Sequence, residues 1–272
     1  MVRATGAIGY FSPWFARVNK EASSGYLDKT FVEMMWYKAF SVWIGLKLGY
    51  HILFQDVDLV WFKNPFEYFH HHQNATKDLN NGMEYTAYLS DDGQRSLRYT
   101  PFYANSGFYY LLSTPKNIYL AYSIVIAFDS LQATGSHQNV FTSRLMETMD
   151  LIESHQLFLN LEDFPSGVKY HHDKPFMTRV VNKQWVPYIF HMCWTANKQQ
   201  KLENFATVKM WYVKETCPVS SLVPPTGQVF RGVVNQIGSG SGPNYLEKLS
   251  PKDTFRIFNS LSSQCCQFKD VL

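Results

Sequence analysis

The apolar positions between residues 27 and 54 change from a helical to an extended pattern. At helical spacing the chain places Leu27, Phe31, Met35, Val42 and Leu46. Gly49 suits the end of such a helix, and the apolar run at 52–54 has the composition of a central strand. Lys38 interrupts the apolar face of the helix, so its ammonium group is expected either to extend into water or to contact a phosphate or nearby carboxylates.

Further apolar runs predict a chain in which strands and helices alternate. Residues 84–90 have the pattern of a strand that carries Asp91 and Asp92 to its C-terminal end. An aromatic strand is interrupted by the small polar segment Asn105-Ser106-Gly107, which fits either a β-bulge or the close approach of a ligand to the backbone. Three more elements are expected: a helix over about 117–131, a strand over 186–190 that ends at His191, and a helix that begins near Asn197.

Polar stretches between these elements predict loops. The first, residues 67–83, contains His70, His71 and His72, whose adjacent side chains diverge in any regular conformation and therefore do not suit one metal ion. The second, residues 164–173, contains another pair of adjacent histidines. The triplet Asn74-Ala75-Thr76 is a potential N-glycosylation acceptor within the first predicted loop.

Composition indicates a folded protein and argues against some partners. The 272 residues are 46% hydrophobic, which is enough to bury a sizeable core. The 25 basic and 22 acidic residues are spread along the chain without a Lys/Arg run, so no nucleic-acid partner is expected. The sequence shows neither a signal-peptide pattern nor an apolar run of about eighteen residues, the length that predicts a membrane span. The four cysteines match no zinc-ligand spacing and leave the redox compartment open.

The chain divides by composition into three parts. Residues 1–25 show neither helical nor strand periodicity and are predicted to be irregular. Residues 26–214 hold the regular patterns and form the predicted globular domain. Residues 215–272 are rich in Pro, Gly and Ser, which predicts a linker followed by one short C-terminal helix.

Two carboxylates provide the strongest candidate chemistry. Asp56 and Asp58 follow the strand at 52–54 and, being two residues apart, point to the same side of an extended backbone. Their negative charges repel, so the pair needs either a shared proton or a divalent cation with oxygen ligands. We favour the cation, because two spaced carboxylates leave open positions for water and for substrate phosphates.

Asp-x-Asp at a strand end occurs in two enzyme classes. A haloacid-dehalogenase-type phosphatase would use Asp56 as its nucleophile, but the continuation to Pro65 predicts a longer extended segment without a helical cap. The stretch resembles instead the Asp-x-Asp segment of GT-A glycosyltransferases, especially the plant and algal nucleotide-diphospho-sugar transferases of family 77, and more distantly family 8. The resemblance continues at Asn105-Ser106-Gly107, at His137-Gln138 and at His191.

This resemblance covers residues 26–213 and implies an α/β fold of the GT-A, Rossmann-like type, with a mixed central sheet flanked by helices. The 55 residues before Asp56 are fewer than the usual first βαβ unit needs, so part of the N-terminal nucleotide-binding unit is expected to be missing. The resemblance also implies a Golgi-luminal enzyme, attached to the membrane only through an anchor that this chain does not contain.

The same resemblance implies roles for individual residues. It makes Asp56, Asp58 and His191 ligands of Mn²⁺ or Mg²⁺, which accept carboxylate and imidazole ligands. Diphosphate binding is implied for Lys38, Lys198 and Lys201. Sugar binding is implied for six residues, among which Gln138, Asp91 and Asn105 are the catalytic candidates: Asn105, Ser106, Gly107, Asp91, Asp92 and Gln138.

His137 departs from the resembled families, which commonly have Asp at this place. The departure leaves a catalytic carboxylate unassigned, and His137 is as well suited to beginning a helix as to chemistry. The expected function is metal-dependent transfer of a sugar, with pentose or galactose as the guess, from a UDP-sugar to a glycan or glycoprotein acceptor with retention. The alternatives are a non-catalytic domain that binds a nucleotide-sugar or a glycan and, after it, a dehalogenase-like phosphatase.

Overall fold

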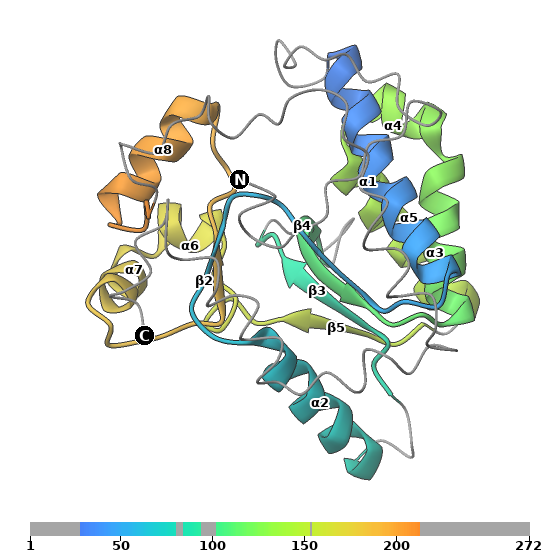
Figure 1. Cartoon of the computed structure of the whole chain (residues 1–272), viewed down its shortest axis with the longest axis horizontal. Coiled ribbons are helices and arrows are strands. Elements are labelled where there is room, and N and C mark those ends of the chain that lie inside the picture. The colour runs from blue at the N-terminus through green and yellow to red at the C-terminus, as the bar shows by residue number, and fades with distance from the viewer. Residues whose placement is uncertain (1–27, 80–83, 94–101, 153, 213–272) are drawn as a thin grey trace, which may run out of the picture. The chain divides into compact units, whose positions relative to one another are not determined.

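The computed structural model describes residues 28–79, 84–93, 102–152 and 154–212. Most of these residues belong to one compact unit, which spans Ser12–Met210. The predictions for residues 1–25 and 215–272 lie outside the described residues. Helices and strands alternate (Figure 1) in the order α1 Lys29–Lys47, β1 Ile52–Gln55, β2 Leu59–Trp61, α2 Pro65–Leu79, β3 Ala87–Asp91, β4 Ala104–Leu111, α3 Pro115–Ile126, α4 Phe128–Thr134, α5 His137–Ile152, β5 Gln156–Leu159, α6 Gly167–His172, α7 Lys174–Val181, β6 Ile189–His191 and α8 Lys198–Thr207.

The first helix and strand follow the predicted pattern. Asp28 caps α1, because its carboxylate accepts a hydrogen bond from the Phe31 backbone N–H at 2.7 Å. The helix ends at Leu48, and Gly49 then adopts φ 90°, a left-handed conformation that suits glycine. The buried face of α1 consists of Val32, Ala39, Val42 and Leu46.

The main sheet is mixed, as expected. Its strand order among the described residues is β1-β4-β3-β5; β1 and β3 pair antiparallel with β4, and β5 pairs parallel with β3. The expectation of a central position for β1 is wrong within the described sheet, because β1 lies at its edge. The strand is apolar for another reason: Ile52 and Phe54 pack on one side of the sheet and Leu53 on the other, so both of its faces are covered.

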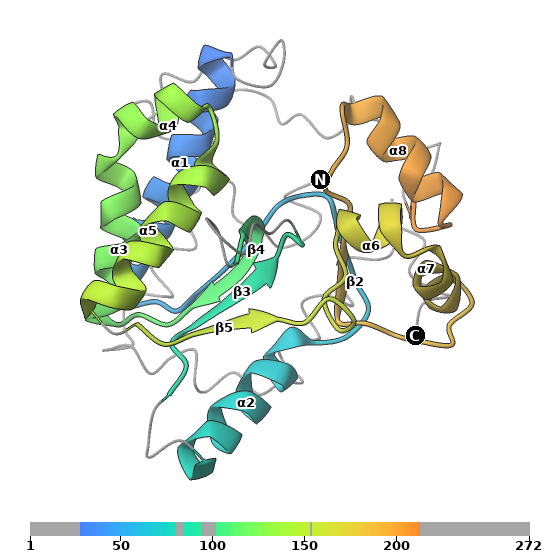
Figure 2. The same cartoon turned by 180° about the vertical axis from the view of Figure 1, so that it is seen from behind.

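Each face of this sheet has its own hydrophobic cluster. Helices α1, α3 and α5 cover one face, and α2 lies on the other (Figures 1 and 2). Along β4, Tyr109 and Leu111 point into the first cluster, whereas Phe108 and Tyr110 point into the second. Because both faces are covered, residues 108–111 of β4 are all apolar or aromatic.

The loop predicted at residues 67–83 is wrong, because α2 occupies most of this range. The Asn64 side chain accepts a hydrogen bond from the Phe66 backbone N–H at 3.1 Å, and Pro65 is the first residue of the helix. Asn-Pro therefore starts a helix here instead of only ending an extended segment. Phe69, which is fully buried, attaches α2 to the sheet. The Asn74-Ala75-Thr76 triplet lies in this helix and not in a loop.

The helix predicted over 117–131 exists as two helices. Thr114 caps α3, since its hydroxyl accepts from the Asn117 backbone N–H at 3.2 Å. The helix ends at Ile126, and α4 begins after Ala127. None of the helices in the part of the chain that the structure describes combines the length and apolar composition of a bilayer-crossing segment.

A second, two-stranded sheet carries the later part of the chain. Strands β2 and β6 pair antiparallel, with Leu59 opposite His191. Helix α6 contradicts the loop predicted over 164–173, and its start at Gly167 lies next to β6 through a bridge between Ser166 and His191. This small sheet brings the end of β6 to the loop that follows β1.

Candidate active site

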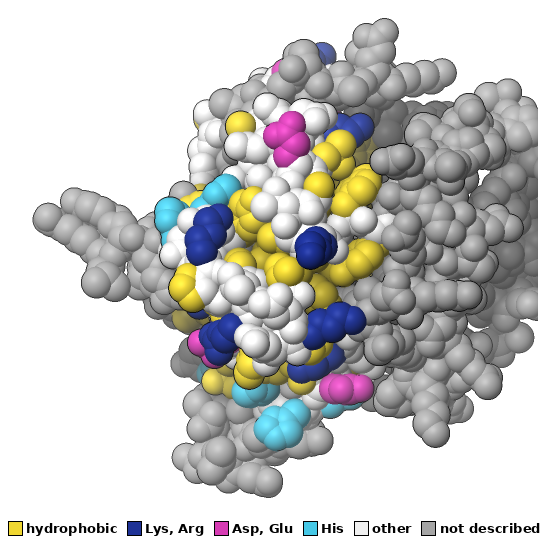
Figure 3. Space-filling model, turned by 90° about the vertical axis from the view of Figure 1, so that its left-hand side faces the viewer, with side chains coloured by type: hydrophobic (Ala, Val, Ile, Leu, Met, Phe, Trp, Pro, Cys, Tyr) yellow, Lys and Arg dark blue, Asp and Glu magenta, His cyan; other side chains and the backbone are white. Residues whose placement is uncertain are grey.

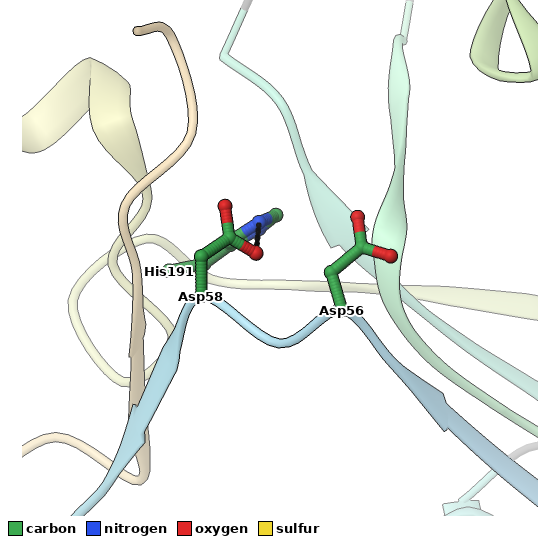
Figure 4. Close-up of side chains that lie close together, drawn as sticks. All are labelled: Asp56, Asp58 and His191. Carbon is green, nitrogen blue, oxygen red and sulfur yellow. Dashed lines mark ion pairs between the residues drawn. The ribbon is translucent and has the colours of Figure 1, made fainter. Parts of the chain in front are cut away.

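The segment between β1 and β2 carries both acidic residues and is anchored on two sides. The Asp56 backbone N–H donates to the Gly107 carbonyl in β4 at 2.7 Å. The Met192 N–H, directly after β6, donates to the Asp58 carbonyl at 3.1 Å. Because Asp56 is held by one sheet and Asp58 by the other, their carboxylates are presented beside His191 at the junction of the two strands (Figure 4).

Asp56, Asp58 and His191 form a cluster that fits a divalent cation. One potential ligand atom from each residue lies within 4.8 Å of the others. The His191 Nε2 atom lies 3.3 Å from Asp58 Oδ1, and the buried His191 Nδ1 has no hydrogen-bond partner among the described residues. Two carboxylates and an imidazole are a donor set that Mn²⁺ or Mg²⁺ can accept. The three predicted metal ligands therefore come together in the fold.

Gly107 is required for this convergence. A Cβ atom at position 107 would lie 2.3 Å from His191 Cε1 and 2.9 Å from Asp56 Oδ2. Both distances are far shorter than carbon contacts normally allow, so any larger residue would push the cluster apart. The close approach expected of this glycine is thus an approach to the acidic cluster itself.

Two lysines neutralise the acidic pair. Lys38 from α1 lies with its Nζ 2.8 Å from Asp56 Oδ1, and Lys201 from α8 lies with its Nζ 2.5 Å from Asp58 Oδ2. Of the expected roles for Lys38, contact with the acidic loop is the one present. Burial by itself would raise the pKa of Asp58, but its hydrogen bond with the His191 imidazole and the positive charge of Lys201 outweigh burial and hold the pKa well below its usual range. Asp58 is therefore ionised at neutral pH.

These residues open onto a pocket of about 420 Å³. The pocket is lined by Asp56, Asp58, Asn105, Ser106, Gly107, Gln138, His191, Cys193, Trp194, Thr195, Ala196 and Lys201. The predicted metal ligands and four of the six predicted sugar-binding residues thus surround one space. The remaining two, Asp91 and Asp92, do not line it.

Of the two interpretations of the polar break in β4, the structure shows the irregular strand. The pairing of β3 with β4 shifts between Leu89 and Ser90, so the strand is irregular here, as a bulge would make it. The backbone N–H of Ser106 donates to Gln138 Oε1 at 3.1 Å, which ties the bulge to the start of α5. With its carbonyl oxygen used in this way, Gln138 keeps its side-chain NH₂ as a donor group beside the pocket.

Asp92 is connected to two residues that line the pocket. Asp91 accepts a hydrogen bond from the Gly93 N–H at 2.8 Å, which is the turn-forming role of an Asx residue. Asp92 accepts from Asn105 Nδ2 at 2.7 Å and from Trp194 Nε1 at 3.1 Å. The sequence analysis makes Asp91 the catalytic candidate of the pair, and the contacts of Asp92 with Asn105 and Trp194 add Asp92 to the residues around the pocket.

His137 begins α5 and is buried, with 1% of its surface exposed. Its ring lies nearly parallel to that of Phe141, with 5.9 Å between the centroids. Burial, helped by the positive charge of Lys38, lowers the pKa of His137 to about 3, so the imidazole is neutral at physiological pH. Of its two expected roles, starting a helix is the one that the structure shows.

The segment from Cys193 to Ala196 was not anticipated as part of the site. It begins two residues after His191, and this closeness to a predicted metal ligand is the sequence signal that could have located it. Trp194 adopts φ 60°, a conformation that costs a bulky residue about 1–3 kcal/mol.

Of the two lysines predicted to bind diphosphate in α8, one lines the pocket. Lys198 is the first residue of α8 and is exposed, and it does not line the pocket, whereas Lys201 one turn later does.

Comparison with known proteins places this geometry in a family. A family model described as nucleotide-diphospho-sugar transferase matches residues 4–205. The chain is 22% identical over 187 residues to a UDP-galactose:fucoside alpha-3-galactosyltransferase of Dictyostelium discoideum, an alignment that covers 62% of this chain and 26% of that protein. It is 27% identical over 103 residues to an uncharacterised protein of Arabidopsis thaliana, covering 38% of this chain and 27% of the relative. No solved structure was found to match the chain.

The chain spans about a quarter of the length of both relatives. The family match, in contrast, covers about three quarters of this chain and includes every strand, the acidic cluster and Gln138. The mixed sheet with helices on both faces agrees with the fold that this family implies. The chain therefore belongs to the nucleotide-diphospho-sugar transferase family.

Proposed function

We propose that the chain is a divalent-metal-dependent glycosyltransferase that uses a UDP-sugar as donor. The observation that carries the proposal is the convergence of Asp56, Asp58 and His191 over Gly107 at the edge of a pocket. Mn²⁺ or Mg²⁺ bound by these three residues would supply positive charge for the diphosphate leaving group. Family membership supports the same proposal, since the matched family is defined by nucleotide-diphospho-sugars.

The surroundings of the pocket suit an anionic donor. Between residues 167 and 210 the sequence has seven basic and two acidic residues, a formal charge of +5 in a chain whose total is +3. Figure 3 shows Lys and Arg side chains spread over the face that carries α8. Such a field raises the local concentration of an anion such as a nucleotide-sugar. Lys201 is the basic residue that lines the pocket, and we assign it to the diphosphate.

For the sugar we assign the polar residues on the β4 side of the pocket. Asn105 is held by Asp92, and its own carbonyl oxygen accepts from the Gly107 N–H at 2.8 Å, so its side chain is fixed. The Gln138 amide faces the same pocket. Fixed hydrogen-bonding groups of this kind orient sugar hydroxyls. Galactose is the first donor sugar we propose, because the Dictyostelium relative is named for UDP-galactose, and a pentose is the second.

We further propose retention at the anomeric carbon by attack on the same face. Among the described residues that line the pocket, the carboxylates are Asp56 and Asp58, and both are assigned to the metal. No further carboxylate there is placed to form a covalent sugar intermediate. In the proposed step, the bond between the anomeric carbon and the diphosphate oxygen breaks, the acceptor oxygen bonds to that carbon, and the acceptor proton passes to the departing diphosphate.

The acceptor that we propose is a glycan or a glycoprotein, and the compartment is the Golgi lumen. Both follow from the family resemblance rather than from a contact in the fold. One argument against the phosphatase alternative no longer holds, because Asn64-Pro65 does start a helix. The family match nevertheless favours the transferase, because the matched family is one of nucleotide-diphospho-sugar transferases.

The test is Mn²⁺-dependent release of UDP from a panel of UDP-sugars, with and without acceptor. Wild-type protein should release UDP, and Asp58→Asn should reduce the rate at least about 100-fold, the scale seen when one charge-stabilising group is lost from an active site. Asp173→Asn is the matched control, because Asp173 also pairs with a lysine, Lys169 at 2.8 Å, but lies away from the pocket. Turnover that survives Asp58→Asn unchanged would exclude the proposal.

One observation favours a second candidate, a non-catalytic domain that binds a nucleotide-sugar. Each carboxylate of the acidic pair already has a lysine partner, so the cluster is neutral without a cation. Calorimetry separates the candidates: metal-dependent UDP binding without release of UDP from any donor would support the binding domain. Metal-dependent binding together with turnover supports the transferase.

A further inference from the structure

We propose that Trp194 forms the wall of the pocket against which the transferred sugar lies, and that Asp92 positions it. This inference rests on the proposed function, because it names the part of the donor that one region of the same pocket recognises. Three features of the described residues carry it: the backbone conformation of Trp194, the hydrogen bond of its indole to Asp92, and the burial of the Asp92 carboxylate.

The backbone of Trp194 is held in a conformation that it would not adopt by itself. A φ of 60° is strained for an aromatic residue, and such strain persists only where the surroundings enforce it. His171 contributes, since its Nε2 lies 3.0 Å from the Trp194 carbonyl oxygen. Gly167 contributes as well, because a Cβ there would lie 2.2 Å from the Cys193 carbonyl oxygen. The segment is therefore pressed against α6 and turned toward the pocket.

The indole ring is oriented by a contact over 102 residues of sequence. Its Nε1 donates to Asp92 Oδ2 at 3.1 Å, while Asp92 Oδ1 accepts from the Asn105 side chain at 2.7 Å. Trp194 and Asn105 both line the pocket, so one carboxylate fixes two pocket residues relative to each other. Asn105 is among the residues assigned to the sugar, which places Trp194 on the sugar side of the donor.

Asp92 is a buried carboxylate with side-chain hydrogen bonds to two residues of the pocket. It is 3% exposed, and in the described part of the chain no Lys, Arg or His forms an ion pair with it. A buried carboxylate without a cation is costly, so a residue that only filled space would be apolar. Its two side-chain hydrogen bonds, to Asn105 and Trp194, are what a positioning residue would make.

The chemistry of a sugar matches this arrangement. A sugar ring has C–H groups on its faces and hydroxyls at its edge, so it packs flat on a rigid aromatic ring while polar groups reach its rim. Trp194 offers the ring, and Asn105 and Gln138 offer the polar groups. The diphosphate requires neither, since it is assigned to Lys201 and the metal ligands, and a comparison of UDP with UDP-galactose separates the sugar from the uracil.

The test compares the affinities of the whole 272-residue chain for UDP and for UDP-galactose, both in Mn²⁺, by calorimetry. Trp194→Gly removes the ring and relaxes the strained backbone, and it should weaken UDP-galactose binding about 10-fold while UDP binding changes less than about 2-fold. Trp194→Phe keeps a ring without its N–H and should lose about 3-fold for UDP-galactose only. The matched control is Trp185→Phe, which also removes an indole hydrogen bond, to the Glu162 carbonyl, outside the pocket.

Asp92→Asn provides a second route if the Trp194 variants do not fold. Asn105 and Trp194 donate to different oxygens of the Asp92 carboxylate, and an amide would turn its NH₂ toward one of these donors, so the same selective loss for UDP-galactose is expected. Equal changes for UDP and UDP-galactose, or no change for UDP-galactose, would overturn the proposed role. A wild-type protein that binds neither ligand would overturn the proposed function, and this inference with it.

Discussion

At the scale of single residues, Gly107 determines whether the acidic cluster can close. The positions of Asp56 and His191 leave no room for a side chain at this point of β4. The strand needs a residue without Cβ at a place where an aromatic strand would otherwise continue. A side chain at position 107 would therefore disturb the metal ligands more than the pairing of the sheet.

Gly107→Ala should weaken Mn²⁺-dependent UDP binding about 10-fold or more, because the new Cβ would meet His191 Cε1 and move a ligand by several tenths of an ångström. Gly45→Ala is the control. Its Cβ would also be crowded, at 2.5 Å, but by the flexible end of Ile52 and away from the pocket. Calorimetry measures the affinity, and circular dichroism measures the melting temperature. An affinity for Mn²⁺ and UDP equal to that of wild type in Gly107→Ala would refute the assignment.

His137 gives a prediction on pH. Burial, with Lys38 nearby, lowers its pKa from the ordinary 6.5 to about 3, so between these pH values the unfolded chain binds a proton that the folded protein does not. Stability contributed by His137 is therefore complete above about pH 6.5 and falls as the pH falls below it. His137→Phe removes the titrating group and keeps a ring beside Phe141.

The free energy of unfolding in urea, measured at pH 7.5 and pH 5, tests this. The wild type should lose about 2 kcal/mol more than His137→Phe between these conditions, at about 1.4 kcal/mol for each pH unit below 6.5. Above pH 7 the difference between the two proteins should be constant, which serves as the internal control. Parallel pH profiles down to pH 5 would show that the folded protein admits a proton at His137.

The sequence allowed the acidic cluster to be predicted but not the network behind it. Asp56 and Asp58 are conspicuous because they interrupt an apolar strand, and the resemblance located His191. Asp92 and Trp194 are an ordinary turn residue and an ordinary aromatic in sequence. Their connection joins residues 102 positions apart, and nothing in local periodicity reports such a contact.

At the scale of elements, two helices from opposite ends of the described chain supply the lysines of the cluster. Lys38 comes from α1 and Lys201 from α8. The helix that holds Lys38 is packed against the sheet by its apolar face, whereas α8 buries Phe205 and is otherwise mainly polar. Because α8 has fewer buried residues than α1, Lys201 is the lysine that we expect to leave its carboxylate partner, Asp58, and bind the diphosphate.

Lys201→Met should therefore change two affinities in opposite directions. Mn²⁺ alone should bind about 5-fold more tightly, because the competing ammonium on Asp58 is gone. UDP in the presence of Mn²⁺ should bind about 10-fold more weakly, because a charged hydrogen bond to the diphosphate is lost. Lys198→Met, in the same helix and outside the pocket, is the control for the metal measurement. Parallel changes of both affinities in Lys201→Met would contradict the exchange.

Most of the elements that the sequence predicted correctly contain a clear apolar pattern, namely α1, β1, β3 and β4. Helix α8 is mainly polar, and its start was predicted at Asn197, which caps it. Helices α2 and α6, which lie where loops were predicted, are polar or short. Helix α2 holds three adjacent histidines and is attached through Phe66 and Phe69, and α6 has six residues, of which Gly167 and Tyr170 are buried. Two buried positions are too few to establish a helical period in a sequence.

At the scale of the whole molecule, the candidate site depends on tertiary structure. Its pocket is built from the segment after β1, from β4, from the start of α5 and from the chain between β6 and α8. These segments are distant in sequence and meet because the four-stranded sheet and the two-stranded sheet share the β1–β2 segment. An unfolded chain cannot offer such a site, so a ligand of this site must stabilise the folded state.

This linkage gives a prediction for thermal unfolding. Mn²⁺ and UDP together, at about 100 times their dissociation constant, should add about 2.7 kcal/mol to the free energy of unfolding, which corresponds to a rise in Tm of about 5–10 °C for a domain of this size. EDTA should abolish the rise due to UDP, because the diphosphate is expected to bind through the metal on Asp56, Asp58 and His191. Asp58→Asn should lose the rise as well, whereas Asp173→Asn should keep it. A rise with UDP that persists in EDTA and in Asp58→Asn would mean that the nucleotide binds without the acidic cluster.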